Sequence, residues 1–224
     1  RVLKKASRSR RPLEVALREA ERIMVEEEER SKAIGMQGEP LFEDGDVVLT
    51  HCNAGSLATV DYGTALAPLR IAKGKGKRIS VIATETRPVL QGARLTTYEL
   101  LKDGFDVTLI SDTMVGYIMW LGMVDKVIVG ADRVLKDGHV INKIGTYQIA
   151  ALAKRHGIPF YVALPSSTFD PETKLEEVKI EERDPREVIY VKKCRIAPKQ
   201  VKVFNPAFDV TPPGLVTALS LIHI

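Results

Sequence analysis

The chain has 224 residues, of which 45% are apolar and 28% are charged. This length suits one large domain or one domain with an appendage, and the composition is ordinary for a globular protein with a substantial core. Only two cysteines occur, Cys52 and Cys194, which excludes a disulfide framework and fits a reducing cytoplasm. No apolar run reaches membrane-spanning length, and no secretory signal opens the sequence.

The net charge of +4 comes from the beginning of the chain, where six of the first twelve residues are basic. A basic segment can contact nucleic acid, but single-strand binding also needs aromatic side chains for stacking, and none is interleaved here. We therefore interpret this segment as a solvated entry to a helix, and we expect no nucleic-acid partner.

Apolar residues recur at helical spacing after this segment, at Leu13, Leu17, Ala20 and Met24. With charged residues between them, they predict an amphipathic helix that continues through the acidic run at 26–29. Gly35 is the expected helix stop.

Five short apolar runs follow, each ending in a polar cluster, at 47–49, 79–82, 107–110, 127–129 and 159–162. Amphipathic segments at 56–72, 93–102, 113–122 and 145–156 predict helices between them. Alternating strands and helices predict an α/β fold, a Rossmann-like parallel sheet flanked by helices, with right-handed crossovers. Residues 136–139 predict a hairpin turn, and the charged stretch 170–186 predicts a surface excursion.

Cys52 follows the first predicted strand, and open parallel sheets bind ligands just outside the carboxyl ends of their strands. A strand-to-helix turn there would offer unpaired N–H groups that bind phosphate and lower a thiol pKa. The alternative is a buried structural cysteine, and the residue types give both interpretations similar weight. The adjacent His51 is not automatically a base for the thiol, since neighbouring strand residues point to opposite faces.

Asp132 ends the fourth predicted strand, where a carboxylate can act as a general acid or base if burial raises its pKa. Its position alone favours the alternative, a cap or a partner of Arg133. Asn142 and Lys143 precede a predicted helix start and would suit a phosphate or a hydroxyl-rich ligand. Spacing alone again favours the alternative, a capping Asn beside a solvated Lys.

Gln91 lies in a loop after the second predicted strand, which Pro88 stiffens by restricting Arg87. An amide there could hold sugar hydroxyls. In isolation the favoured interpretation is a plain surface loop with an ion pair between Glu85 and Arg87.

Fingerprints for cofactors are missing from the sequence. The Lys-Gly run at 73–77 follows a predicted helix rather than a strand, so it fails the context test for a nucleotide loop. The four histidines are scattered and the two cysteines are far apart, so metal-ligand spacing is absent as well. We expect neither a cofactor nor a metal.

Several longer motifs resemble the 5-methylthioribose-1-phosphate isomerases of methionine salvage. They are HCNAGSLAT from His51, DYGTAL from Asp61, ETRPVLQGARLT from Glu85, GADR from Gly130, NKIGTY from Asn142, HGIPFYVALPSSTFD from His156 and FNPAFDVTPP from Phe204. The resemblance covers most of the chain, from Leu13 to Ala218. Because the motifs are long and ordered, they are far more specific than any single short pattern.

The resemblance implies that Cys52 and Asp132 are the catalytic pair and that Gln91, Asn142 and Lys143 bind substrate. The implied reaction turns the cyclic aldose 1-phosphate into the open-chain 5-methylthioribulose 1-phosphate. Phosphate blocks the anomeric oxygen, so an acid must assist ring opening before hydrogen moves between C2 and C1, as a proton or as a hydride. We assign Asp132 to the ring oxygen or a hydroxyl, and Cys52 to the carbon step as base or stabiliser.

Two other branches of the wider superfamily share the sheet and the NKIGT-like motif. A ribose-1,5-bisphosphate isomerase would need a second phosphate site where an apolar pocket would otherwise lie. A regulatory subunit of translation initiation factor 2B would have a degraded catalytic pair. The combination of AGSLAT with LQGARLT resembles the methylthioribose-phosphate branch. Candidates for an apolar pocket wall are Met36, Met114, Met119 and Trp120, although ordinary core is the favoured interpretation for them.

The resemblance also implies a cytoplasmic homodimer with a smaller amino-terminal domain, in which an Arg-Gly-Ala loop helps to bind phosphate. Residues 1–40 would be a helical remnant of that domain, and residues 41–224 a Rossmann-like catalytic domain truncated at its carboxyl end. The chain starts on Arg rather than Met, and its last residues, LSLIHI, depart from the family. We therefore expect a fragment that lacks a complete site.

Overall fold

The central element is a six-stranded parallel sheet in the order β12-β7-β4-β1-β2-β3. The computed structural model describes residue 7 and residues 10–222, so most of the basic segment lies outside the described residues. The strands are β1 (Val47–Thr50), β2 (Ser80–Thr84), β3 (Asp106–Ile110), β4 (Lys126–Val129), β7 (Phe160–Pro165) and β12 (Ala218–Ile222). The five predicted strands are confirmed.

Strand β12 was not predicted, because the end of the chain departs from the family pattern. Its backbone pairs in parallel with β7, from Ala218 opposite Tyr161 to Ile222 opposite Pro165. The apolar end of the sequence thus continues the sheet at its edge.

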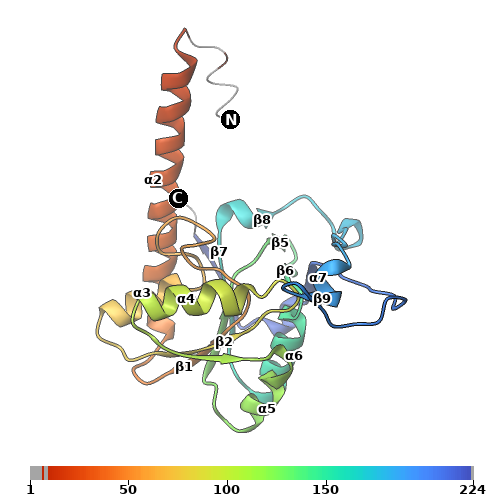
Figure 1. Ribbon diagram of the computed structural model, residues 1–224. Coiled ribbons are helices and arrows are strands. Elements are labelled where there is room, and N and C mark those ends of the chain that lie inside the picture. Colours follow the sequence, from red (N-terminus) through yellow and green to blue (C-terminus); the bar gives the residue numbers. More distant parts are fainter. Residues whose placement is uncertain (1–6, 8–9, 223–224) are drawn as a thin grey trace.

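Helices cover both faces of the sheet (Figure 1). One face carries α2 (Pro12–Gly38), α3 (Ala67–Gly74) and α4 (Thr97–Lys102), and the other carries α5 (Val115–Trp120) and α6 (Thr146–His156). Alternate strand residues supply the two cores, with Leu49 and Val127 on the α5–α6 side and Val48 and Ile128 on the other. This arrangement confirms the α/β prediction.

Two helix predictions were wrong at their ends. Helix α2 passes through Gly35 and ends at Gly38. The predicted helix at 56–72 begins only at Ala67, because Asp61 and Gly63 have φ of +62° and +84°, outside the right-handed helical region. Residues 52–66 instead form a series of turns, in which the Thr64 N–H donates to the Ala54 carbonyl at 2.9 Å.

A second, four-stranded sheet in the order β11-β6-β5-β8 lies beyond the carboxyl end of β4. Its strands are β5 (Arg133–Leu135), β6 (Val140–Lys143), β8 (Phe169–Asp170) and β11 (Phe208–Thr211). Antiparallel pairing of β5 with β6 confirms the hairpin turn predicted at 136–139.

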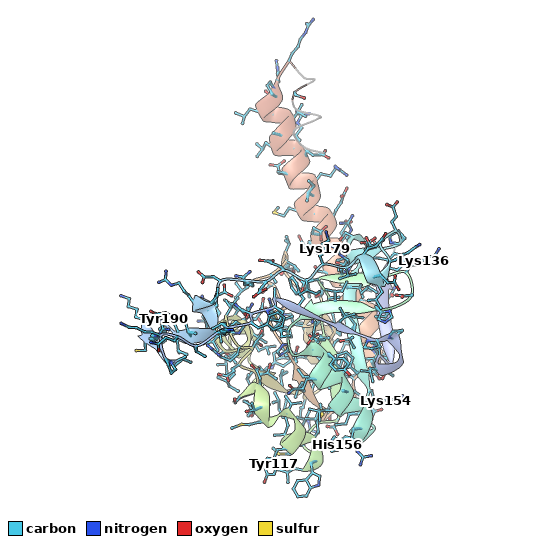
Figure 2. All side chains as sticks on the ribbon, turned by 90° about the vertical axis from the view of Figure 1, so that its right-hand side faces the viewer. Tyr117, Lys136, Lys154, His156, Lys179 and Tyr190 are labelled. Atoms are coloured by element: carbon cyan, nitrogen blue, oxygen red, sulfur yellow. The ribbon has the colours of Figure 1, made fainter. Side chains whose placement is uncertain are left out.

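The charged excursion leads into an arm of α7 (Arg186–Ile189), β9 (Tyr190–Val191) and β10 (Cys194–Arg195). This arm, which carries Tyr190, projects from the side of the body (Figure 2). The remaining helical turns are a π-helical turn at Gly92–Thr96 and 3₁₀ turns at Glu39–Leu41, Asp112–Met114, Ser166–Thr168, Leu175–Glu177 and Pro213–Leu215. Among the described residues, no helix combines the length and apolar character needed to cross a membrane.

Gly35 has a packing role, since a Cβ there would lie 2.8 Å from Ile71 Cγ1 and 3.0 Å from the Ala67 carbonyl oxygen. We expect Gly35→Val to lower the free energy of unfolding by about 2 kcal/mol, because it forces α2 away from α3. A Cβ at Gly74 would meet nothing within 4 Å, so Gly74→Val is the matched control. Denaturant unfolding of both variants tests this, and equal stabilities would contradict the packing role.

Candidate active site

The order of the sheet strands reverses between β1 and β4. From β1 the chain builds β2 and β3 on one side, and then returns to build β4, β7 and β12 on the other. At such a switch point the loops leave the sheet in opposite directions and open a crevice at the carboxyl ends of the strands. Cys52 and Asp132 follow these two neighbouring strands.

All five predicted site residues line one cavity of about 450 Å³. They are Cys52, Gln91, Asp132, Asn142 and Lys143. They come from different parts of the fold. Cys52 and Asp132 follow strands of the large sheet, Asn142 and Lys143 end β6 of the small sheet, and Gln91 precedes the π-helical turn. The volume falls within the range of small-molecule pockets. The structure therefore brings together residues that lie far apart in the sequence.

Cys52 does not sit at a helix amino terminus, which corrects the expectation for this position, because turns separate it from α3. It has a φ of +64°, its N–H donates to Thr86 Oγ1 at 2.9 Å, and its carbonyl accepts from Thr96 Oγ1 at 2.5 Å. Burial raises the pKa of the Cys52 thiol, against the backbone N–H of Asn53 and the charge of Lys143, which lower it. The neutral thiol therefore predominates at pH 7.

Asp132 is a solvent-exposed residue that lines the cavity. Burial raises the pKa of its carboxyl group, while the positive charge of Lys143 opposes that rise. The alternative that Asp132 pairs with Arg133 is wrong, because the Arg133 guanidinium faces Asp170 at 3.6 Å. A carboxyl group with a raised pKa beside a buried thiol is suited to acid–base chemistry.

Asn142 and Lys143 end β6 at the cavity. Asn142 is 5% exposed and donates from Nδ2 to Thr146 Oγ1 at 3.0 Å, so its amide is held in place. The Lys143 ammonium lies 4.7 Å from the centre of the Phe208 ring. It faces both Cys52 and Asp132 closely enough to influence their pKa values.

The amino terminus of α6 is occupied by Asp209 from β11. Its carboxylate accepts the Gly145 N–H at 2.7 Å and the Tyr147 N–H at 3.0 Å. Burial raises the pKa of Asp209 to about 6, in spite of these two hydrogen bonds. Asp209 therefore caps the start of α6. Of the two features expected to bind phosphate here, the helix amino terminus and the Lys143 side chain, the Lys143 ammonium is the one left for a ligand.

Two amide oxygens are buried at the cavity without a hydrogen-bond partner among the described residues, Gln91 Oε1 and Asn53 Oδ1. The Asn53 Nδ2 group donates to Glu99 Oε1 at 2.6 Å and to Thr96 Oγ1 at 3.1 Å, which fixes the amide orientation. Gln91 is thus part of the cavity and not of a plain surface loop. An unsatisfied buried acceptor costs about 1–3 kcal/mol, so such groups call for an explanation.

His51 has both ring nitrogens engaged. Its Nε2 lies 2.9 Å from the Ile144 carbonyl oxygen, which can only accept, and its Nδ1 lies 2.6 Å from Thr84 Oγ1. Burial lowers the pKa of the imidazole, so the ring is neutral, with the proton on Nε2 and Thr84 donating to Nδ1. Neither nitrogen is free to act as a base for Cys52, in line with the caution drawn from strand geometry.

None of the four candidates for an apolar wall lines the cavity. The favoured interpretation as ordinary core is confirmed for Met119 and wrong for Met36, Met114 and Trp120, which are largely exposed. The apolar lining comes from other residues: Ala54, Leu57, Ala58, Leu95, Ala131, Pro165 and Phe208. Two of these, Leu57 and Ala58, lie in turns that the sequence pattern assigns to the helix at 56–72, so their position could not be predicted correctly.

Curated relatives match most of the chain. Methylthioribose-1-phosphate isomerase from Thermosipho africanus is 60% identical over 218 residues, which cover 97% of this chain and 63% of that protein. The enzyme of the same name from Petrotoga mobilis is 59% identical over 202 residues, 90% of this chain and 58% of that protein. The chain thus spans about three fifths of the length of these relatives.

Solved structures agree with this grouping. A structure described as 5-methylthioribose 1-phosphate isomerase from Pyrococcus horikoshii matches with a TM-score of 0.90 and 43% identity, over 97% of this chain and 62% of that chain. One described as translation initiation factor eIF-2B, subunit delta, from A. fulgidus matches with a TM-score of 0.93 and 57% identity, over 98% and 65%. The model of the initiation factor 2 subunit family matches residues 1–220, and the chain belongs to that family.

Proposed function

We propose that the protein is an aldose–ketose isomerase that converts 5-methylthioribose 1-phosphate to 5-methylthioribulose 1-phosphate in methionine salvage. The observation that carries the proposal is that Cys52 and Asp132, each with its pKa raised by burial, share one cavity with Gln91, Asn142 and Lys143. Relatives about 60% identical are named for this reaction.

Asp132 would deliver a proton to the ring oxygen, which ring opening requires because phosphate blocks the anomeric oxygen. A raised pKa keeps more of the carboxyl group protonated near neutral pH than an exposed aspartate would allow. Cys52 would then act at carbon, as base or as stabiliser of the hydrogen transfer. Its position in the cavity places the thiol beside Asp132 and Lys143, both of which influence its pKa.

The other lining groups match the remaining parts of the substrate. Lys143 supplies a positive charge for the phosphate. The buried Gln91 oxygen needs a donor, which a sugar hydroxyl could provide. The wall that includes Leu57, Ala58 and Leu95 suits a methylthio group better than a second phosphate, which counts against a ribose-1,5-bisphosphate isomerase.

The second candidate is a regulatory subunit of the translation initiation factor 2B type. The high structural similarity to the A. fulgidus protein described by that name favours it. Such a subunit would have lost its catalytic pair, whereas Cys52 and Asp132 are both present in one cavity. The isomerase is therefore the better supported of the two.

We also propose that α2 belongs to a smaller amino-terminal domain and that the protein works in the cytoplasm. The apolar side chains of Leu13, Leu17 and Met24 are exposed along α2, as expected for a face that another part of a longer protein covers. The low cysteine content supports the reducing compartment.

Replacing the catalytic pair tests the reaction. We expect Cys52→Ser and Asp132→Asn each to lower kcat for 5-methylthioribose 1-phosphate by about 10²-fold or more in the full-length protein. Product formation by the unsubstituted protein and by both variants is the measurement. A folded protein that ignores this sugar but converts ribose 1,5-bisphosphate belongs to the sister branch, and inactivity on both sugars favours the regulatory subunit.

The pH dependence of kcat/KM should reflect the raised pKa values of Cys52 and Asp132. With one group acting protonated and the other deprotonated, the profile is bell-shaped, and raised pKa values displace both limbs toward alkaline pH. We expect the acid limb above the ordinary range of an aspartate and the alkaline limb above that of a free thiol. Cys52→Ser should remove the alkaline limb, and an alkaline limb that persists unchanged would exclude Cys52 as its source.

The resemblance to the isomerases implies a homodimer, and helix α5 offers an apolar surface for the second copy. Exposed side chains on and beside it are Met114, Tyr117, Trp120, Leu121 and Met123. The Tyr117 and Trp120 rings stack, and Tyr117 lies at the end of the body opposite α2 (Figure 2). Clustered exposed apolar groups of this kind mark interaction sites.

Light scattering should give the full-length protein twice its chain mass. We expect Trp120→Glu to yield a monomer, because it places a charge in the apolar contact. Tyr98→Glu, at an exposed aromatic residue on α4, is the control and should remain a dimer. A monomeric unsubstituted protein, or a Trp120→Glu variant that still dimerises, would argue against this surface.

A further inference from the structure

Glu99 on α4 is a buried carboxylate outside the set of predicted site residues. It is 4% exposed and accepts four hydrogen bonds. Its Oε1 accepts from Asn53 Nδ2 at 2.6 Å, and its Oε2 accepts from the Ser56 N–H at 2.8 Å, Ser56 Oγ at 3.0 Å and Arg70 Nη2 at 2.6 Å. Three of the four donors belong to the turn that directly follows Cys52.

The turn is shaped to admit this carboxylate. A Cβ at Gly55 would collide with the Glu99 carboxylate, so only glycine lets the backbone pass this close. Arg70 extends the anchoring, since its Nη1 donates to the Tyr62 carbonyl at 2.6 Å while its Nη2 binds Glu99. Residues 53–56 and the Tyr62 carbonyl are therefore held by the same ion pair, Glu99 with Arg70.

The anchored turn contacts the cavity in two ways. Asn53 directly follows Cys52, and its backbone N–H lowers the pKa of the Cys52 thiol, against the effect of burial. Leu57, Ala58 and Thr59, which come directly after the anchored residues, line the cavity. A shift of residues 53–56 would thus move the Asn53 N–H relative to the thiol and displace the adjoining wall.

We propose that Glu99 is a positioning residue for the isomerase site, holding residues 53–56 so that the backbone next to the Cys52 thiol and the adjoining cavity wall keep their positions. The proposal rests on the proposed function for its catalytic consequence. Its geometric part rests on the hydrogen bonds of Glu99 alone.

A glutamine cannot replace Glu99 in this role. Both carboxylate oxygens accept, one from Asn53 and the other from Ser56 and Arg70. An amide has one acceptor oxygen, and its NH₂ group would face a donor on whichever side it takes. Glu99→Gln therefore removes at least one of these hydrogen bonds while it keeps the size of the side chain.

The test compares Glu99→Gln with Asp103→Asn in the full-length protein carrying Cys194→Ser, which leaves Cys52 as its sole cysteine if the rest of the protein adds none. Asp103 also forms an ion pair with Arg70, at 2.6 Å, but makes no hydrogen bond to residues 53–56. Asp103→Asn is therefore the matched control for the loss of a carboxylate. The thiol is titrated by the pH dependence of its alkylation with iodoacetamide. Circular dichroism confirms folding, and kcat and KM are measured in parallel.

We expect Glu99→Gln to slow Cys52 alkylation at pH 8 by about threefold or more, because losing the Asn53 N–H raises the thiol pKa and lowers the thiolate fraction. We expect kcat to fall about tenfold or more, with a smaller change in KM, since misplacement acts on the chemical step. Asp103→Asn should keep the alkylation profile and kcat of the unsubstituted protein.

A folded Glu99→Gln protein with unchanged alkylation and kcat overturns the proposal. If that variant does not fold, Asn53→Ala decides, because it removes one bond to Glu99 and leaves the pair with Arg70 in place. It should show the same slower alkylation, and an unchanged rate overturns the proposal. An unsubstituted protein without isomerase activity overturns the proposed function alone, since alkylation still reports on Glu99.

Discussion

No helix follows directly after β1, and the cavity depends on the irregular segment that takes its place. In a usual crossover the strand would turn quickly into a helix that packs on the sheet. Here sixteen residues, 51–66, intervene between β1 and α3, and Glu99 from α4 holds two of them, Asn53 and Ser56. They form one wall of the crevice that the reversal of strand order opens, and they set the position of Cys52.

Burial dominates the electrostatics of the site. It raises the pKa values of Cys52 and Asp132, and it lowers that of His51. In all three cases the neutral form is favoured, as expected when charges are withdrawn from water. Lys143 is the compensating charge for Cys52 and Asp132, because it lowers both of their pKa values. This cation, close to the thiol and the carboxyl group, also offers an anionic substrate an attractive charge at the same cavity.

Local pattern is enough to find the strands and their carboxyl ends. Apolar runs of three or four residues followed by polar clusters identify five of the six sheet strands, and the rule that ligands bind at the carboxyl ends of parallel strands marks Cys52 and Asp132 as candidates. The hairpin between β5 and β6 was predicted for the same local reason, its turn residues. These features depend on residues that are neighbours in the chain.

The features that escaped prediction depend on contacts between distant residues. Glu99 looks like a solvated charge on an amphipathic helix, and only the approach of residues 53–56 shows that it is buried. The turns at 53–66 carry apolar residues at spacings that a helix would also show, and the positive φ of Asp61 is invisible in the pattern. The cap of α6 by Asp209 joins residues more than sixty positions apart.

One fold in this family carries proteins named for isomerisation and proteins named for translation initiation, so the fold alone does not decide the activity. The decision rests on groups that a purely structural role would not keep. Cys52 is partly buried, Asp132 lines the same cavity, and desolvation raises the pKa of both groups. A protein that only bound partners through its surface would have no use for such a pair, whereas the proposed proton transfer would use both groups.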